Sequence, residues 1–396
     1  MKKDKKPSIR FKEFTEAWEQ RKLDEISKIT MGQSPDSINY TDNNDDTILI
    51  QGNADLDNGK VIPRIYTKQI TKTSKPNDII FTVRAPVGEV ARNSYNAVIG
   101  RGVASITGNN FLYHTLKRLN EINYWNKLSA GSTFDSINSD QLKSIEIDLP
   151  NKDEQKVIGN FFEKIDNLIT LHQRKYDKLV CIKKSLLEKM FPQNGKNIPE
   201  IRFKEFTEAW EQRKLGEYGD FTYGHSAPKW SVTSDAKTPC VRYGELYTKF
   251  GVKIDKVFSY TNMPKNKLVF SKGNEVLIPR VGEDPYDYNH CTWLSMPNVA
   301  IGEMISIYYT KQNPLFTAIM YNATLRNEFA IRVEGGSVTN LYYDKLKDID
   351  VSFPNKEEQE KISTFFYKID NLITLHQCKL EKLKNLKKSL LNKMFV

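Results

Sequence analysis

The sequence of 396 residues is poor in the residues that bind metals or that form disulfide bonds in small folds. Its four cysteines (Cys181, Cys240, Cys291 and Cys378) are scattered, form no CxxC pair and occupy no matching positions, which argues against a disulfide framework or a zinc site. No stretch approaches the roughly 18 uninterrupted apolar residues of a membrane-spanning helix. The opening lysines are not followed by the apolar core of a signal peptide. We therefore expect a cytoplasmic protein without a bound metal.

Sequence patterns for catalysis are missing as well. There is no P-loop pattern GxxxxGK[ST], so ATP hydrolysis by this chain is not expected. Residues 313–316 (NPLF) approach the NPP[FY] motif of amino-methyltransferases but lack its second proline and an upstream Gly-rich cofactor loop, and we interpret them as a loop. Residues 154–156 (EQK) match half of a magnesium-dependent nuclease motif. Because the second copy reads EQE at 358–360, a charge cluster at a helix start is the better interpretation. We predict no catalytic residues.

The charge balance, by contrast, favours a particular class of partner. Lysine and arginine number 59 against 49 aspartates and glutamates, which gives a net charge of +10, and aromatic residues make up 11% of the chain. An excess of positive charge favours binding to a polyanion such as a nucleic acid. The length exceeds that of a usual single domain and predicts two or more units.

Internal repetition is the most informative feature of the sequence. Residues 9–23 (IRFKEFTEAWEQRKL) recur letter for letter at 201–215. A second repeat opens with PNKxEQ at 150–155 and at 354–359 and runs through KIDNLITLHQ to KSLLxKMF. The segments between the repeats, 24–148 and 216–352, show almost no similarity to each other. A frame built twice around different inserts indicates one task performed on two different targets.

The second repeat predicts a long helix in each half. Apolar residues recur every three or four positions from Ile158 to Leu186 and from Ile362 to Leu390, which is typical of a coiled-coil seam. Asn151 and Asn355 are the expected N-caps. About 40 residues at 1.5 Å each give a helix of roughly 60 Å. His172 and His376 stand at matching seam positions, where we interpret them as polar register markers.

We expect the two helices to pair with each other in antiparallel orientation. The second insert leaves near the end of the first helix and returns at the start of the second. Since the termini of a compact domain usually lie close together, only an antiparallel pair brings these two points near each other. The last residues, Lys393 to Val396, then lie beside the domain that begins at the N-terminus. The two ends of the chain should therefore lie side by side and together form the same local structure as the continuous internal junction 189–203.

The 15-residue repeat predicts a short amphipathic element. Phe11, Phe14 and Trp18 are spaced i, i+3 and i+7, and the same spacing recurs at 203, 206 and 210. A packing brace at the base of each domain is the expected role, and docking of a partner subunit is the alternative.

Both inserts indicate mixed α/β domains with short strands. We predict strands at 47–51, 78–83 and 98–106 in the first insert and at 238–243, 275–282 and 300–307 in the second, with a turn at Asn58-Gly59. The fold class is α+β: two α/β domains joined by two long helices in an antiparallel coiled coil, with an internal pseudo-twofold repeat. The expected boundaries are 1–150 for the first domain, 151–191 for the first helix, 192–200 for a linker, 201–354 for the second domain and 355–396 for the second helix.

This arrangement resembles the specificity (S) subunit of type I restriction–modification systems. Each repeated helix is entered through [L/F]PNKxEQ, and residues 78–88 (DIIFTVRAPVG) followed by 99–102 (IGRG) are similar to a segment that many target-recognition domains of that family carry. So are residues 131–133 (GST), with 335–337 (GGS) at the same stage of the second half. The second domain departs from the pattern, with IPRVGE at 278–283 where the first has VRAPVG at 83–88.

The resemblance implies a sequence-specific DNA-binding subunit that recognises a bipartite, asymmetric target. It implies adenine methylation by two modification (methyltransferase) subunits and restriction by ATP-dependent translocase and nuclease subunits. S-adenosylmethionine, ATP and Mg are then expected on those partners, and no cofactor is expected on this chain. The alternative from the residues alone is a coiled-coil adaptor whose two domains bind proteins, and a third reading is an intrinsic nuclease.

Residues that read bases are predicted from hydrogen-bonding capacity, since arginine pairs bidentately with guanine, and asparagine or glutamine with adenine. In the first domain the candidates are Gln33, Ser34, Gln51, Asn53, Arg84, Arg92 and Arg101. In the second they are Tyr223, His225, Lys229, Arg242, Tyr243 and Arg280, with Tyr286 and Tyr288 on an expected loop. Arg84 and Arg101 belong to the family-like segment, where an internal role in holding the fold is the alternative.

Overall fold

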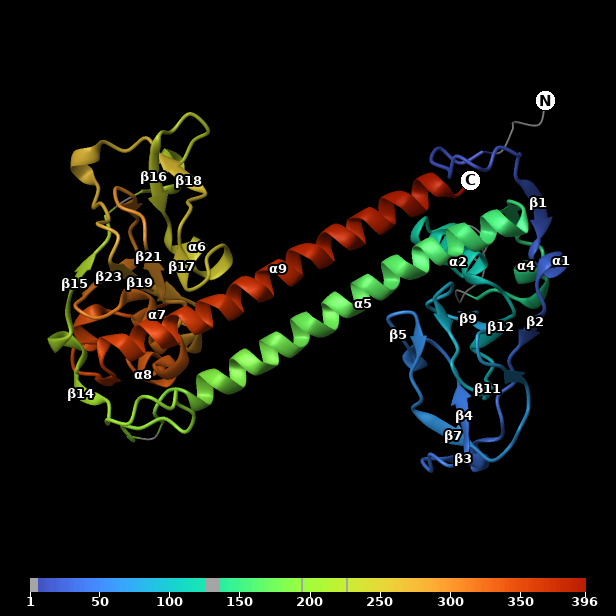
Figure 1. Cartoon of the computed structure of the whole chain (residues 1–396), viewed down its shortest axis with the longest axis horizontal. Coiled ribbons are helices and arrows are strands. Elements are labelled where there is room, and N and C mark those ends of the chain that lie inside the picture. The colour runs from blue at the N-terminus through green and yellow to red at the C-terminus, as the bar shows by residue number, and fades with distance from the viewer. Residues whose placement is uncertain (1–5, 126–135, 194, 226) are drawn as a thin grey trace. The chain divides into compact units, whose positions relative to one another are not determined.

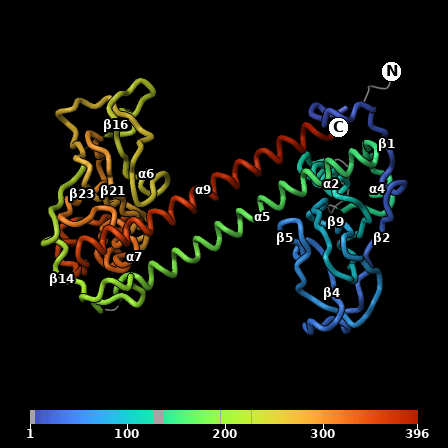
Figure 2. The backbone as a smooth tube through the Cα atoms, in the orientation of Figure 1, coloured from blue at the N-terminus to red at the C-terminus, as the bar shows by residue number. Residues whose placement is uncertain are grey.

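The structure, a computed structural model, describes residues 6–125, 136–193, 195–225 and 227–396, so the predicted segment 131–133 lies outside the described residues. The chain divides into two compact units. The first unit comprises Met1–Gln173 and Cys378–Val396, and the second comprises Arg174–Gln377. Each unit therefore contains one mixed α/β domain and a part of each long helix, which can be followed in Figures 1 and 2.

The first unit opens with a strand and a short helix and then forms two sheets. Its strands are β1 Glu19–Lys22, β2 Ile29–Met31, β3 Tyr40–Thr41, β4 Thr47–Ile50, β5 Leu56–Asp57, β6 Lys60–Val61, β7 Ile65–Thr67, β8 Thr73–Ser74, β9 Ile79–Thr82, β10 Val90–Arg92, β11 Ala97–Ile99, β12 Val103–Ile106 and β13 Glu146–Leu149. Its short helices are α1 Leu23–Ile26, η1 Ser37–Asn39, η2 Asn53–Asp55, α2 Asn110–Glu121 and α4 Ser139–Lys143. The predicted turn at Asn58-Gly59 is confirmed, since both residues have positive φ between the antiparallel strands β5 and β6.

The second unit repeats this plan with different strand lengths. Its strands are β14 Glu211–Lys214, β15 Gly219–Tyr223, β16 Thr238–Val241, β17 Lys253–Ile254, β18 Ser259–Thr261, β19 Glu275–Pro279, β20 Val281–Gly282, β21 Thr292–Leu294, β22 Ala300–Ile301, β23 Ile305–Thr310, β24 Glu334–Gly335, β25 Thr339–Asn340 and β26 Asp350–Phe353. Its short helices are η3 Leu215–Glu217, η4 Lys229–Ser231, α6 Tyr243–Thr248, η5 Lys265–Lys267, η6 Pro285–Asp287, α7 Pro314–Thr324, α8 Arg326–Ala330 and η7 Tyr343–Lys345.

The continuous strand expected at 98–106 is wrong, because the segment forms two strands in two different sheets. β11 belongs to the sheet of order β3-β7-β4-β11-β8, whereas β12 belongs to the sheet of order β2-β12-β9-β10-β6-β5. The chain crosses from one sheet to the other over residues 100–102. The segment 300–307 breaks in the same way between β22 and β23, which lie in the sheets β18-β16-β22 and β15-β23-β19-β21-β17. Buried β-branched residues on both sides of each break gave the sequence its strand-like appearance.

The two long helices lie close to where the sequence predicted them, as α5 Lys152–Lys189 and α9 Lys356–Met394. Asn151 and Asn355 are confirmed as N-caps: each side-chain oxygen accepts from a backbone N–H three residues on, at 2.9 Å. The loop expected at 313–316 is wrong, because Asn313 caps α7 and its Oδ1 accepts from the Phe316 N–H at 2.9 Å. His172 and His376 are half-buried in α5 and α9, and their role stays an interpretation.

Within each unit the parts of α5 and α9 run antiparallel, as expected. In the first unit Asp166 of α5 accepts from Lys387 of α9, while Phe162, earlier in α5, lies against Phe395, which follows α9. In the second unit Lys183 pairs with Asp370. The two ion pairs are related by the repeat, since 166 and 370, like 183 and 387, are 204 residues apart. The same antiparallel contact is therefore made twice, once in each unit.

The expected imitation of the internal junction by the two ends of the chain is confirmed by backbone hydrogen bonds. In the second unit, the Ile201 N–H donates to the carbonyl of Lys189 at 2.9 Å. In the first unit, the Ile9 N–H donates to the carbonyl of Lys393 at 2.9 Å. A covalently continuous segment in one unit and two separate chain segments in the other thus build the same structure.

Matching aromatic clusters surround these junctions. In the first unit Trp18 lies edge-on to Phe111 and Phe395, with ring centroids 5.5 and 6.4 Å apart. In the second unit Trp210 is edge-on to Phe316 and 6.0 Å from Phe191. The spacing i, i+3, i+7 of the 15-residue repeat does not produce a helix: turns lead into β1 and β14, which pair antiparallel with β13 and β26. The expected packing brace is nevertheless what these aromatic residues form.

A buried ion pair fixes this brace to the start of each long helix. The Arg10 guanidinium donates twice to the Glu154 carboxylate, at 2.7 Å in both bonds, and Glu154 is fully buried. The hydrogen bond to Glu154 also raises the pKa of Arg10. Arg202 and Glu358 repeat the pair with the same two 2.7 Å bonds. Residues 154–156 therefore form the predicted charge cluster at a helix start.

We predict that Arg10→Ala destabilises the first unit by about 3–5 kcal/mol, because it leaves the Glu154 carboxylate buried and unpaired. Urea unfolding followed by circular dichroism measures the change. The control is Arg21→Ala, which breaks an exposed pair with Glu19 and is expected to cost less than about 1 kcal/mol. The double substitution Arg10→Met with Glu154→Leu should recover most of the loss. Equal effects of Arg10→Ala and Arg21→Ala would contradict this assignment.

Candidate functional site

The crossing between the two sheets of the first unit gathers the ends of several strands. The Gly100 N–H donates to the carbonyl of Ile50 at the end of β4, at 2.8 Å. The Gln33 N–H donates to the carbonyl of Ile99 at 2.8 Å, just after β2. The Val83 N–H, directly after β9, donates to the carbonyl of Gly102 at 2.9 Å. We call residues 32–34, 51, 83–84 and 100–102 the first corner.

Glycine is required at this corner because backbones approach each other closely. A Cβ added at Gly32 would lie 2.0 Å from the carbonyl oxygen of Gly100, and one at Gly102 would lie 2.1 Å from that of Gln51. Both of these neighbours are backbone atoms, which cannot swing aside as the end of a flexible side chain can. The IGRG segment at 99–102 therefore has a physical reason that is independent of any ligand.

The second unit contains the same backbone arrangement, which we call the second corner (residues 224–225, 242, 280 and 302–304). The Gly302 N–H donates to the carbonyl of Val241 at 2.8 Å, and the His225 N–H donates to that of Ile301 at 3.0 Å. The Arg280 N–H donates to the carbonyl of Met304 at 3.0 Å. A Cβ at Gly224 would lie 2.1 Å from the Gly302 oxygen. Two inserts without visible sequence similarity thus share one backbone junction.

Most of the first-domain candidates meet at the first corner. The Ser34 Oγ accepts from the Arg101 N–H at 3.1 Å, and the Gln51 amide donates to the Tyr40 hydroxyl at 2.7 Å. The exposed candidates at or next to this corner are Gln33, Asn53, Arg84 and Arg101. Residues from four loops therefore present amide and guanidinium groups on one patch of the first unit, which the sequence alone could not bring together.

Arg92 is the exception, because its guanidinium is used inside the domain. It donates to the carbonyls of Asn77 and Gly108 at 2.8 and 2.9 Å and to the side chain of Asn110 at 2.8 Å. It also lies 5.0 Å from the centre of the Tyr113 ring, and burial lowers its pKa. Arg92 thus joins β10 to the start of α2, and its guanidinium bonds inside the domain and not to a ligand.

The second-domain candidates gather around the second corner. Arg280 stacks on the Tyr223 ring at 4.7 Å and donates to the Met304 sulfur at 2.9 Å, and burial raises the pKa of Tyr223. Arg242 is half-buried at the N-cap of α6. The exposed candidates are His225, Lys229 and Tyr243.

The loop expected for two tyrosines holds for Tyr288, which lies in no helix or strand, and is wrong for Tyr286, which lies in η6. Tyr288 is fully buried, and its hydroxyl donates to the carbonyl of Thr339 at 2.6 Å. Tyr286 is exposed and lies under the Arg326 guanidinium at 5.2 Å. Tyr288 is therefore not placed to touch a ligand, whereas Tyr286 is exposed, and the Tyr-Asp-Tyr sequence at 286–288 does not distinguish the two.

The two corners differ in the side chains that they present at matched positions. When the two corners are matched by their equivalent backbone hydrogen bonds, Gln33 corresponds to His225, Gln51 to Arg242 and Arg101 to Glu303. Glu303 was not among the predicted candidates, although its place after Ile301-Gly302 repeats that of Arg101 after Ile99-Gly100. A carboxylate only accepts hydrogen bonds and a guanidinium only donates them, so the two corners differ in hydrogen-bonding character at this position.

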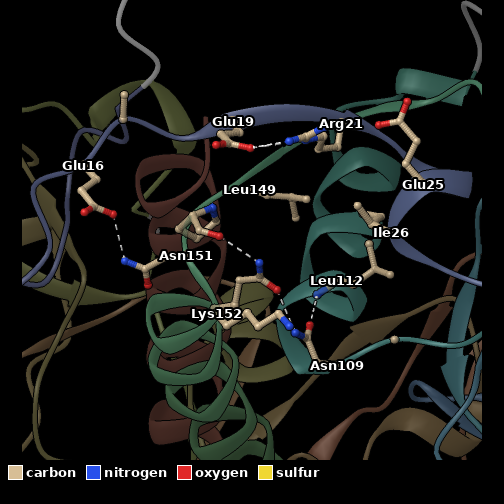
Figure 3. A pocket seen from close by; sticks show the side chains of 14 residues that line it. Glu16, Glu19, Arg21, Glu25, Ile26, Asn109, Leu112, Leu149, Asn151 and Lys152 are labelled. Carbon is tan, nitrogen blue, oxygen red and sulfur yellow. Dashed lines mark hydrogen bonds and ion pairs between the residues drawn. The ribbon is translucent and has the colours of Figure 1, made fainter.

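A separate hollow of about 670 Å³ lies on the frame of the first unit, between β1 and the starts of α2 and α5 (Figure 3). The Asn109 amide donates to Gln155 at 2.9 Å within it. In the second unit Gln312 stands at the position that corresponds to Gly108, and its side chain accepts from Gln359 at 2.8 Å. Gly108 is among the residues that line the hollow.

Within the described residues there is no group of three or more His, Cys, Asp and Glu side chains placed to hold a metal ion. No helix of the described parts of the chain is long and apolar enough to cross a membrane.

Comparison with known proteins gives one consistent family. The model of the type I restriction modification DNA specificity domain matches twice, at residues 15–180 and 207–385. The MjaX type I restriction enzyme specificity subunit of Methanocaldococcus jannaschii is 34% identical over 184 residues, which are 44% of this chain and 43% of that subunit. The match thus spans less than half of that relative's length. The MjaIX specificity subunit of the same organism is 24% identical over 344 residues, 80% of this chain and 76% of its own.

The fold itself is shared with a solved specificity subunit. The crystal structure of the type I restriction–modification S subunit from M. genitalium superposes with a TM-score of 0.63 over 99% of both chains, at 18% identity. A chain from a structure on complex assembly and conformational transition of the type I R-M system gives a TM-score of 0.50 at 16% identity. The predicted fold class is therefore confirmed.

We predict that Gly32→Ala disrupts the first corner, since the new methyl group would overlap the Gly100 carbonyl. Overpacking of this kind costs about 1–3 kcal/mol, measurable as a lower urea midpoint. Gly52→Ala is the matched control, because Gly52 has extended backbone (φ 179) and no atom within 4 Å of an added Cβ. Its stability should stay within about 0.5 kcal/mol of the parent. A Gly32→Ala protein with parental stability would show that the corner tolerates a side chain.

Proposed function

Because the chain belongs to the type I restriction–modification DNA specificity family, we propose that it is the subunit that recognises a bipartite, asymmetric DNA target, with each corner reading one half-site. The observation that carries this proposal is the repeated corner: one backbone junction, built twice, presents different hydrogen-bonding groups. Two identical readers would require a symmetric target. Side chains as different as Arg101 and Glu303 at matched positions support an asymmetric one.

The charge of the protein supports DNA as the ligand. The net charge of +10 favours a polyanion, and lysine contacts to phosphates add affinity without base preference. The exposed Gln33, Asn53, Arg84 and Arg101 are of the types that hydrogen-bond base edges. Their roles as base contacts, like those of His225, Lys229, Arg242, Tyr243 and Arg280, are part of this proposal.

We further propose that the chemistry belongs to partner subunits. In this proposal, two methyltransferase subunits bring S-adenosylmethionine and modify adenines, and restriction subunits bring ATP and Mg. This chain supplies sequence recognition and acts with its partners in the cytoplasm, where the DNA is accessible. What supports the division is the absence of a P-loop pattern and of an amino-methyltransferase motif in the sequence.

The first prediction from this proposal concerns independent half-sites. Replacing residues 24–148 with the corresponding insert of another family member should change one half of the methylated sequence and leave the other half unchanged. Methylation mapping of DNA from cells that carry the parent or the hybrid measures this. The reciprocal exchange of residues 216–352 is the control, and it should change the opposite half. A change in both halves from one exchange would show that the inserts do not read independently.

The second prediction concerns the partners. The frame segments are nearly identical although the inserts are not, so they should offer two similar docking surfaces to two copies of one methyltransferase subunit. Lys175 and Lys379 are exposed, matched positions on α5 and α9. Native mass spectrometry should give a complex with two methyltransferase subunits per chain, and charge reversal at either lysine should weaken one of the two docking events. A limit of one subunit at excess partner contradicts the idea.

A further inference from the structure

Each unit exposes one large apolar side chain far more than an ordinary surface residue. Ile38 is 90% exposed and Trp230 is 75% exposed, the two highest values among the large hydrophobic residues that the structure describes. Single apolar residues on a surface are common and need no explanation. These two, however, are 192 residues apart, the offset of the 15-residue repeat, although the inserts around them differ in sequence.

The same structural element presents both side chains. Ile38 is the middle residue of η1 Ser37–Asn39, and Trp230 is the middle residue of η4 Lys229–Ser231. Each of these single turns begins five residues after the corner glycine, Gly32 or Gly224. We call the two side chains the apolar tips. Their position is therefore a property of the shared fold and not of one insert.

Hydrogen bonds hold the first tip in place. The Gln69 amide oxygen accepts from the Asp36 N–H at 2.7 Å and from the Asn39 side chain at 3.0 Å, one on each side of the turn. The Lys68 N–H donates to the carbonyl of Asn39 at 3.1 Å. An anchored turn lowers the entropy lost when the tip meets a ligand.

The second tip is held by the corresponding contacts. The Asn262 N–H donates to the carbonyl of Ser231 at 2.9 Å, as Lys68 does to Asn39 in the first unit. The hydroxyls of Ser231 and Thr261 are 2.8 Å apart and buried. Ala227, three residues before the tip, is buried against Cys240 and Ala300. The indole lies outside this packing and is 75% exposed.

A hydrogen bond joins the segment that carries the first tip to the first corner. Tyr40, two residues after Ile38, accepts a hydrogen bond at 2.7 Å from the side chain of Gln51 at the first corner. In the second unit the turn follows His225 by a few residues, and the His225 backbone is bonded to the second corner. A ligand that covers either corner therefore has the tip within its reach.

Exposed lysines lie near both tips, and the exposed Asp36 and Ile70 lie near the first. Lys68 and Lys72 flank the contacts of the first turn, and Lys229, Lys265 and Lys267 lie on or beside the contacts of the second. Lysines near an apolar side chain suit a ligand with phosphates outside and bases inside. The charge complementarity favours DNA.

We propose that Ile38 and Trp230 are apolar contacts that enter a DNA groove, one in each half-site, and pack against base edges or base steps beside the corner. The inference rests on the proposed function and deepens it by naming a contact that hydrogen-bonding rules do not find. Apolar side chains contact thymine methyl groups and wedge between base steps, and aromatic ones stack on bases. The two tips differ in size and shape, so they favour different sequences at the position that they touch.

The test uses the full chain in complex with its methyltransferase subunits and four duplexes: the target found by methylation mapping, two versions with one half-site scrambled, and one with both scrambled. Trp230→Ala should weaken binding about 5- to 100-fold on duplexes that keep the second half-site, the scale of aromatic contacts to bases. It should leave binding unchanged where that half is scrambled. Ile38→Ala should show the opposite half-site dependence with a smaller factor, and Trp230→Phe should retain most of the affinity.

Ile331→Ala is the matched control, since Ile331 is 73% exposed but ends α8, which lies beside α7 and away from β16 and β18 within its unit (Figure 1). Its affinity should equal that of the parent. Acrylamide quenching of the tryptophan fluorescence provides a second readout. The target duplex should protect part of the parent's fluorescence from acrylamide, and this protected part should be missing in Trp230→Ala. A purely structural role of Trp230 would not produce this difference.

Failure of the inference can be told apart from failure of the proposed function. If the parent complex does not distinguish the four duplexes, the proposed function itself fails. If the parent distinguishes them but both alanine variants do so equally well, the tips are not DNA contacts. Loss of methyltransferase subunits from the alanine variants with unchanged DNA discrimination would assign the tips to a protein interface and overturn the proposal.

Discussion

The buried pair between an arginine of the 15-residue repeat and a glutamate in the first turn of a long helix is the contact on which each unit depends. It joins residues that are 144 positions apart in the first unit and 156 apart in the second, so it closes the whole α/β insert into a loop. A buried carboxylate without its guanidinium is strongly unfavourable, and the pair therefore holds one register. Around it, Pro150 and Asn151 with Gln155 complete the hydrogen bonds at the helix start.

This fixed frame explains how the inserts diverge without loss of the fold. The frame supplies the aromatic clusters, the ion pairs and the antiparallel helix contacts, and it does so twice with nearly the same residues. Within the inserts the strand order of the larger sheet, the corner glycines and the short turns that carry Ile38 and Trp230 keep a common geometry. The side chains on that geometry are free to differ, which is what a protein with two different half-sites requires.

Much of the fold followed from local rules. The seam periodicity and the N-caps Asn151 and Asn355 were predictable because a helix start and a coiled-coil seam have strong sequence patterns. The antiparallel pairing was predictable from the connectivity of the second insert. The split of 98–106 into two strands was not, since buried residues on both sides of Gly100 look like one strand until two sheets are known to meet there. The burial of Tyr288 and the internal bonds of Arg92 depend on distant partners such as Thr339 and Asn77, which no local pattern specifies.

The sequence by itself determined that the chain is a duplicated frame with two unlike inserts, that its long helices pair antiparallel, and that its charge suits a polyanion. The repeats, the helix seams and the charge are periodic or additive along the chain, and the antiparallel orientation follows from connectivity, so all of them can be read without coordinates. Only the tertiary structure decided which polar residues share a corner, that Glu303 matches Arg101, and that Ile38 and Trp230 occupy one position. Those relations are set by backbone contacts between strands far apart in sequence. The two inserts are too dissimilar in sequence to be aligned without the structure.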